Sequence, residues 1–77
     1  MHWEVWDTDT ANLLDACKSE AEALALVREL LAKGWPVEDL SLMFEDESRP
    51  AETLPPAVTG VELARRAEET APQRRTA

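Results

Sequence analysis

The sequence predicts an α+β domain in the order strand, strand, helix, strand, followed by a short C-terminal helix. Two short segments alternate apolar and polar residues with the period of a β-strand. A run of good helix formers lies between them. The chain has 77 residues, which is the size of one small domain. We therefore expect a single two-layer fold.

The first two strands are expected to form a hairpin. Residues 2–7 alternate in polarity and contain two tryptophans, which is typical of a strand. The polar segment 7–12 has no large apolar side chain, and its short Asp, Asn and Thr side chains favour a turn. A short apolar run at 13–17 then supplies the second strand.

A long helix is expected at 20–33. Ser19 and Glu22 fit a capping box, in which the two side chains satisfy backbone amides at the helix start. Gly34 is a natural helix stop, and Pro36 prevents the helix from resuming. A similar capping-box pattern at 59–62 predicts the start of the short second helix.

The third strand is expected at 40–45, because Leu40, Leu42 and Phe44 alternate with more polar residues. If this strand docks beside the first, the sheet is three-stranded, antiparallel or mixed, with strand order 2-1-3 and a right-handed crossover. The long helix then covers one face of the sheet. The predicted divisions are a ββαβ core domain at 1–46, an irregular proline-containing loop at 47–58, a short helix at 59–70 and a disordered tail at 71–77.

The chain is acidic, with 16 Asp and Glu, 8 Lys and Arg, and a formal net charge of -8. The charge is concentrated in residues 1–57, which carry a net charge of -9, whereas residues 58–77 carry +1. An acidic body repels phosphate backbones, so direct nucleic-acid binding is disfavoured. The same charge leaves open a protein that neutralises a basic partner, as an antitoxin-like protein or a nucleic-acid mimic would.

The residues that carry most enzyme and metal chemistry are scarce. His2 is the only histidine and Cys17 the only cysteine, whereas a structural zinc site needs four ligands and a thiol nucleophile needs a base. The pair Asp7 and Asp9 resembles the start of a calcium loop, but Lys18 occupies the position of the final glutamate. We therefore expect no catalytic residues, no cofactor and no metal site.

Several segments form a shared pattern. They are Trp3-x-Val5-Trp6-Asp7, Asn12-Leu13-Leu14, Glu20-x-Glu22-Ala23-Leu24 and Gly60-x-Glu62-Leu63-Ala64. Over residues 3–67 this pattern resembles small uncharacterised bacterial proteins of an actinobacterial type. Such proteins commonly carry glycine before the asparagine, where this chain has Ala11. The resemblance implies no activity, substrate or catalytic residue.

The face of the sheet away from the long helix is the candidate interface. Trp6 and Met43 are its apolar members, with Glu4 and Glu45 beside them. Either the C-terminal helix or a partner must cover this face. We expect a non-catalytic interaction or regulatory module that forms a homodimer. The lone cysteine, and the lack of a basic segment followed by an apolar stretch at the N-terminus, favour a cytoplasmic location without membrane contact.

Overall fold

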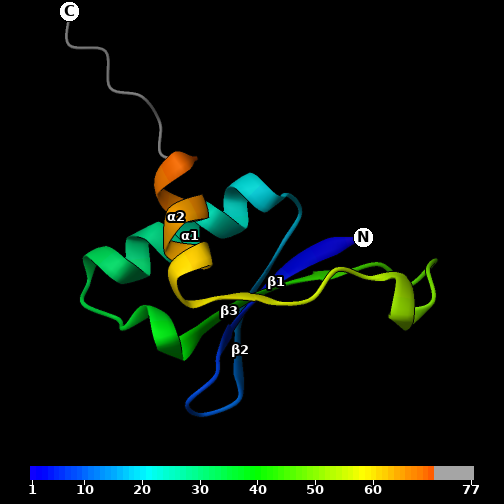
Figure 1. The fold of residues 1–77 in the computed structure, drawn as a ribbon, viewed down its shortest axis with the longest axis horizontal. Helices are drawn as coiled ribbons and strands as arrows, with labels where there is room; N and C mark the ends of the chain where they lie inside the picture. The colour runs from blue at the N-terminus through cyan, green and yellow to red at the C-terminus, as the bar shows by residue number, and fades with distance from the viewer. Residues whose placement is uncertain (71–77) are drawn as a thin grey trace, which may run out of the picture.

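The computed structural model describes residues 1–70, so the tail predicted at 71–77 lies outside the described residues. The chain folds as an α+β structure, as predicted (Figure 1). Short 3₁₀ turns, η1 (Val37–Asp39) and η2 (Ala51–Thr53), lie before and after the third strand. The strands and helices are β1 (His2–Asp7), β2 (Asn12–Cys17), α1 (Glu20–Ala32), β3 (Leu40–Glu45), β4 (Val58–Thr59) and α2 (Gly60–Glu69).

The sheet is antiparallel and has four strands in the order β2-β1-β3-β4. The first three strands follow the predicted order, but the prediction of a three-stranded sheet was wrong. The missing strand, β4, has two residues and falls across the boundary between the predicted loop and helix. Two residues are too few to show the alternation by which a strand is recognised in a sequence.

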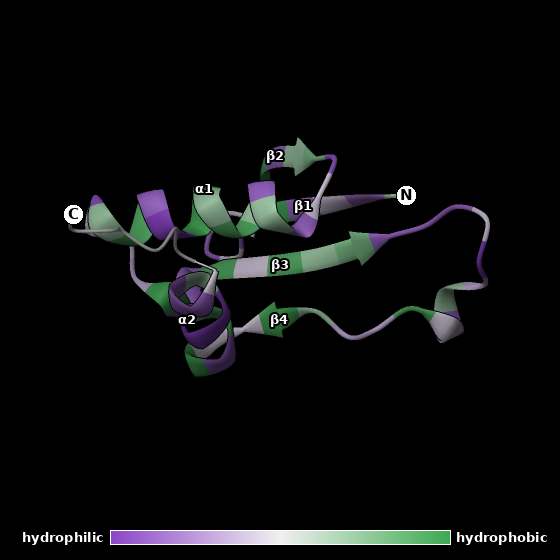
Figure 2. Ribbon diagram, turned by 90° about the horizontal axis from the view of Figure 1, so that it is seen from above, coloured by the Kyte–Doolittle hydropathy of each residue, from purple (hydrophilic) through white to green (hydrophobic). Residues whose placement is uncertain are grey.

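The face of the sheet toward the helices carries the apolar side chains of β1 and β3. Trp3 is paired with Phe44 and Val5 with Leu42 across the two central strands, and directly paired residues point to the same face. Val5 is fully buried and Leu42 nearly so. Figure 2 shows the matching pattern, with apolar residues along β3 and a banded α1.

Both helices pack on this same face of the sheet (Figure 1). Leu24 and Val27 of α1 share one buried cluster with Leu63 and Ala67 of α2. The guanidinium of Arg28 in α1 also donates a hydrogen bond of 3.3 Å to the carbonyl of Ala67. The C-terminal helix therefore adds to the core beside α1, and within residues 1–70 no helix covers the other face.

The two predicted capping boxes behave differently. Ser19 caps α1 by accepting a 3.1 Å hydrogen bond from the amide of Glu22, as predicted. At 59–62 the helix begins where the pattern predicts, with Thr59 as the N-cap residue of α2, but the predicted capping hydrogen bond to the Thr59 side chain is not formed. The carboxylate of Glu62, the other half of the pattern, is bound instead by Arg65 and Arg66 one turn later.

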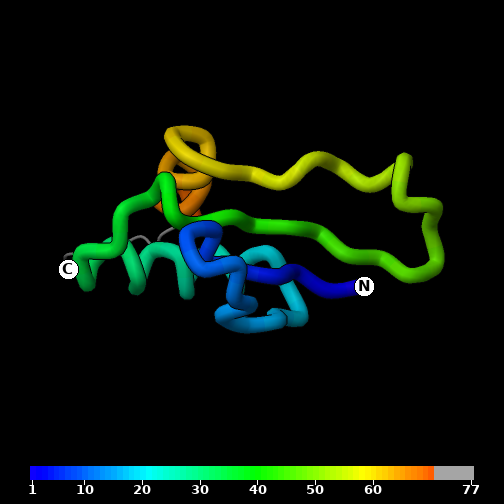
Figure 3. The backbone as a smooth tube through the Cα atoms, turned by 90° about the horizontal axis from the view of Figure 1, so that it is seen from below, coloured from blue at the N-terminus to red at the C-terminus, as the bar shows by residue number. Residues whose placement is uncertain are grey.

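The chain between β3 and β4 forms a long arm (Figure 3). The two strands pair at only two positions, Ser41 with Thr59 and Leu42 with Val58. Beyond them the arm leaves the sheet and contains η2. Pro55 lies near its return to β4 and has no N–H with which to extend the ladder.

The turn between β1 and β2 places Ala11 in a left-handed conformation, with φ of 59°. Asp7 organises the turn by accepting hydrogen bonds from the amide of Asp9 (3.0 Å) and the hydroxyl of Thr10 (2.7 Å). A left-handed backbone costs an alanine more than a glycine, because the Cβ atom crowds the carbonyl.

Replacing Ala11 by glycine is therefore expected to stabilise the fold by up to about 1 kcal/mol. Chemical denaturation measures the free energy of unfolding. The matched control is Ala21→Gly in α1, where the backbone is helical and a loss of up to about 1 kcal/mol is expected. A loss of stability in Ala11→Gly equal to that of the control would contradict the assignment of this turn.

Leu63 and Val61 test the packing of α2. Leu63 is fully buried, whereas Val61 on the same helix is 84% exposed. Leu63→Ala is expected to lower the free energy of unfolding by about 2–5 kcal/mol, because it leaves a cavity in the core. Val61→Ala should change it by less than about 0.5 kcal/mol. Similar small effects in both variants would mean that α2 does not belong to the core.

Candidate functional site

The candidate site is the side of the sheet opposite the helices, which we call the open face. Its residues follow from the register, in which Glu4 lies opposite Met43, Trp6 opposite Ser41 and His2 opposite Glu45. On the other side of β1, Trp6 pairs with Leu13 of β2. The open face thus carries His2, Glu4, Trp6, Leu13, Ser41, Met43 and Glu45, which include all four predicted interface residues.

Three large apolar side chains form a strip on the open face. Trp6 and Met43 are half-buried, and Leu13 is 46% exposed. A shallow depression of about 270 Å³ lies beside Trp6 and Met43 and is otherwise lined by Asp7, Thr8, Ala11 and Ser41. The depression is wide and apolar, so its shape suits contact with another surface.

Leu13 was not among the predicted interface residues. The β1–β2 register shifts between Val5 and Trp6, so β2 contains an irregularity. In an unshifted ladder Leu14 would lie opposite Trp6. Because of the shift, Leu13 takes that position on the open face, and Leu14 packs against the core. Two adjacent large apolar residues in a short strand are the sequence signal, because a strand can bury only one of them on a given face.

Glu4 holds Trp6 in place. The indole Nε1 of Trp6 donates a 2.9 Å hydrogen bond to one carboxylate oxygen of Glu4, and Nε2 of His2 lies 2.8 Å from the other. The Glu4 side chain is only 18% exposed. The hydrogen bond from His2, reinforced by the one from Trp6, lowers the pKa of Glu4 against the opposing effect of partial burial. Glu4, predicted as a polar neighbour of Trp6, is thus its direct hydrogen-bond partner.

Cys17 and His2, the two residues considered for catalysis or metal binding, lie in different environments. Cys17 is buried in the core, and this burial, with the nearby charges of Asp15 and Glu22, raises the pKa of its thiol. A raised pKa keeps the thiol protonated at neutral pH, which makes it a poor nucleophile. His2 is bound to Glu4 on the open face.

Two kinds of feature are missing from the described part of the chain. Within residues 1–70 there is no group of three or more His, Cys, Asp or Glu side chains arranged to hold a metal ion. Within the same range, neither helix has the length and apolar character needed to cross a bilayer.

A second charged feature is the acidic end, formed by Asp7, Asp9, Glu38 and Asp39. The β1–β2 turn is held against η1 by a 2.8 Å hydrogen bond from the amide of Thr8 to the carbonyl of Asp39. Loss of solvation, followed by the charges of the other three carboxylates, raises the pKa of Asp39. Like charges at short range repel one another. A cationic group that binds at this end of the molecule would relieve that repulsion.

The Glu4 contacts predict a pH response of Trp6. Because the folded-state pKa of Glu4 lies below the ordinary value of 4.5, its stabilising effect is present above that value and is lost as the pH falls through the folded pKa. The indole N–H resonance of Trp6 should therefore shift in an NMR titration with a midpoint below 4.5. Glu4→Gln should abolish the shift, and Glu45→Gln should leave it unchanged. A midpoint at or above 4.5 in the unaltered protein would contradict the assigned contact.

Comparison of the chain with protein-family models, curated proteins and solved structures finds no match. The expected resemblance to small actinobacterial proteins therefore stays a prediction.

Proposed function

We propose that this chain is a small non-catalytic interaction module that pairs with a second copy of itself through the open face. The strip of Trp6, Leu13 and Met43 supports the proposal, because no helix in residues 1–70 covers it. A large aromatic side chain with a fixed orientation is a common anchor of protein interfaces, and the hydrogen bond to Glu4 fixes the indole of Trp6.

The edges of the sheet are less suited to pairing than its face. β2 is an edge strand with an irregular register, and the carboxylate of Asp15 accepts a 2.9 Å hydrogen bond from the amide of Ala16. Irregularities and charged side chains at an edge oppose the addition of another strand. The opposite edge strand, β4, has only two residues. Association through the open face is therefore favoured over a continuous intermolecular sheet.

The charge distribution favours a second copy as the occupant. Two copies of a chain with net charge -8 repel one another over most of their surfaces. On the open face, however, the charge of Glu4 is bound by His2 and by the indole of Trp6. A two-fold symmetric contact brings the same apolar strip from both copies together, with Glu45 near its margin.

The open face is small, so we expect a reversible dimer. A six-residue strand is about 20 Å long, and neighbouring strands are about 4.8 Å apart. Such a footprint is below that of a standard stable interface, which buries roughly 800 Å² on each partner. We therefore expect association in the micromolar range.

A second candidate function is neutralisation of a basic partner. The observation that favours it is the acidic end, where four carboxylates gather and the pKa of Asp39 is raised. Two carboxylates of α1 are less available, because Glu20 lies 3.9 Å from Arg66 and Glu29 lies 3.3 Å from Lys33. A basic partner would then contact the acidic end.

Sedimentation equilibrium tests the proposed dimer. Leu13→Glu and Trp6→Ala should each weaken association by about tenfold or more, because they remove anchors of the apolar strip. Val61→Glu is the matched control, because it introduces the same charge at an exposed apolar residue of α2. The control should associate like the unaltered protein.

The dependence of binding on salt concentration distinguishes the two proposed functions. Apolar self-association should hardly weaken as the salt concentration rises, whereas binding of a basic partner should weaken steeply. A protein that stays monomeric at high micromolar concentration contradicts the dimer. Equal loss of association in Leu13→Glu and Val61→Glu would place the contact away from the open face.

A further inference from the structure

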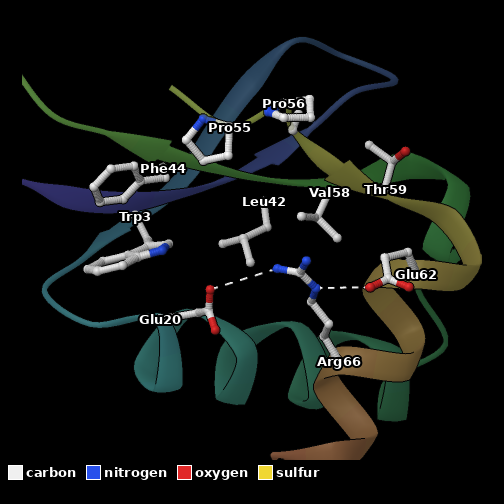
Figure 4. Close-up of a pocket in the computed structure, with 11 residues that line it drawn as sticks. Trp3, Glu20, Leu42, Phe44, Pro55, Pro56, Val58, Thr59, Glu62 and Arg66 are labelled. Atoms are coloured by element: carbon white, nitrogen blue, oxygen red, sulfur yellow. Dashed lines mark hydrogen bonds and ion pairs between the residues drawn. The ribbon is translucent and has the colours of Figure 1, made fainter. Parts of the chain in front are cut away.

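A second hollow lies on the helix side of the sheet, opposite the open face (Figure 4). It is a cavity of about 340 Å³ between β3, the end of the arm, the first turn of α1 and the exposed side of α2. This volume lies near the lower end of the roughly 300–1,000 Å³ range of small-molecule sites. The cavity is independent of the open face and of the function proposed for it.

The cavity exists because the β3–β4 ladder stops early. The last pair is Leu42 with Val58, and the preceding residues of the arm are Pro55, Pro56 and Ala57. The two prolines lack the N–H groups that a longer ladder would need. The arm therefore stands away from β3 beside Phe44 and leaves a gap that neither helix fills.

The sheet and arm sides of the cavity are apolar and partly aromatic, whereas its helix side carries charged residues. Trp3 and Phe44 pack against one another with ring centroids 4.9 Å apart and an angle of 51° between the ring planes. Leu42 and Val58 complete the sheet side of the wall, and Pro55 lies at the arm (Figure 4). These surfaces suit a flat apolar group.

One guanidinium, that of Arg66 from α2, points into the cavity beneath Leu42 (Figure 4). Its Nε donates a 3.1 Å hydrogen bond to Glu62. Hydrogen bonds from Arg65 and then Arg66 lower the pKa of Glu62 to about 2, so Glu62 is ionised at neutral pH. Glu62 therefore orients the Arg66 side chain.

The two terminal nitrogens of Arg66 make no hydrogen bond within residues 1–70. Nη1 lies 3.9 Å from the carboxylate of Glu20, which is beyond hydrogen-bond distance. Nη2 makes no hydrogen bond to any residue within the described range 1–70. Since Glu20 is about half exposed, it can turn toward solvent when another anion approaches. Nη1 and Nη2 can therefore donate two parallel hydrogen bonds to a carboxylate.

We propose that this cavity binds a small organic carboxylate with a flat apolar body. The carboxylate takes the place of Glu20 at Nη1 and Nη2 of Arg66, and the apolar body lies against Trp3 and Phe44. A cationic ligand would be repelled by Arg66, because Glu62 is already bound by two arginines and Glu20 is half exposed to solvent. A neutral ligand would lack the charge-assisted hydrogen bonds.

Isothermal titration calorimetry with three matched probes tests the charge preference. Naphthylacetate, naphthylacetamide and naphthylethylamine share one apolar body and differ in charge. We expect naphthylacetate to bind with a submillimolar dissociation constant and the other two to bind at least about tenfold more weakly. Binding of the amide or the amine as strongly as the carboxylate, or no binding of the carboxylate, would overturn the proposal.

Three substitutions locate the site. Arg66→Gln should weaken naphthylacetate binding by about tenfold or more. The matched control is Arg65→Gln, the neighbouring arginine that also binds Glu62 but does not line the cavity, and it should change the affinity by less than about threefold. Glu20→Gln removes the competing carboxylate, so it should strengthen binding severalfold.

The Glu20→Gln result keeps the proposal testable if Arg66→Gln fails to fold, which circular dichroism would reveal. Weaker binding of naphthylacetate in Glu20→Gln would contradict the exchange of one carboxylate for another. Trp6→Ala should leave binding unchanged, because Trp6 lies on the open face. A loss of binding in Trp6→Ala would move the ligand to the other side of the sheet.

Discussion

The packing of α2 beside α1 is the contact on which the rest of the structure depends. Leu63 and Ala67 are buried in the cluster that also contains Val5 and Leu24. Arg28 of α1 links the two helices by donating a hydrogen bond to the carbonyl of Ala67. Because apolar burial is the main favourable term in folding, this contact commits both helices to one face of the sheet. The open face is its direct consequence.

The same contact gives the two sides of the sheet different chemistry. On the open face, the charge of Glu4 beside the apolar strip is bound by His2 and Trp6. On the helix side, α2 brings Arg66 to a cavity that is apolar on its sheet and arm sides. A thin sheet thus offers a surface suited to another protein on one side and a hollow suited to a small anion on the other.

Local pattern predicted the main elements well, because each depends on residues that are close in the chain. The alternation at His2–Asp7 and Leu40–Glu45 matches the observed strands, and Ser19 caps α1. The features that were missed depend on tertiary contacts. β4 is set by pairing with Ser41 and Leu42, and the position of Arg66 is set by the packing of α2. Leu13 reached the open face through a register shift that strict alternation does not contain.

The most direct test of this account is a methyl NOESY experiment on the dilute, monomeric protein. The methyl groups of Leu63 and Ala67 should show cross-peaks to Leu24 and Val27 of α1, which share their buried cluster. They should show none to the indole of Trp6 on the opposite side of the sheet. Cross-peaks between Leu63 and Trp6 would place α2 over the open face and contradict the account.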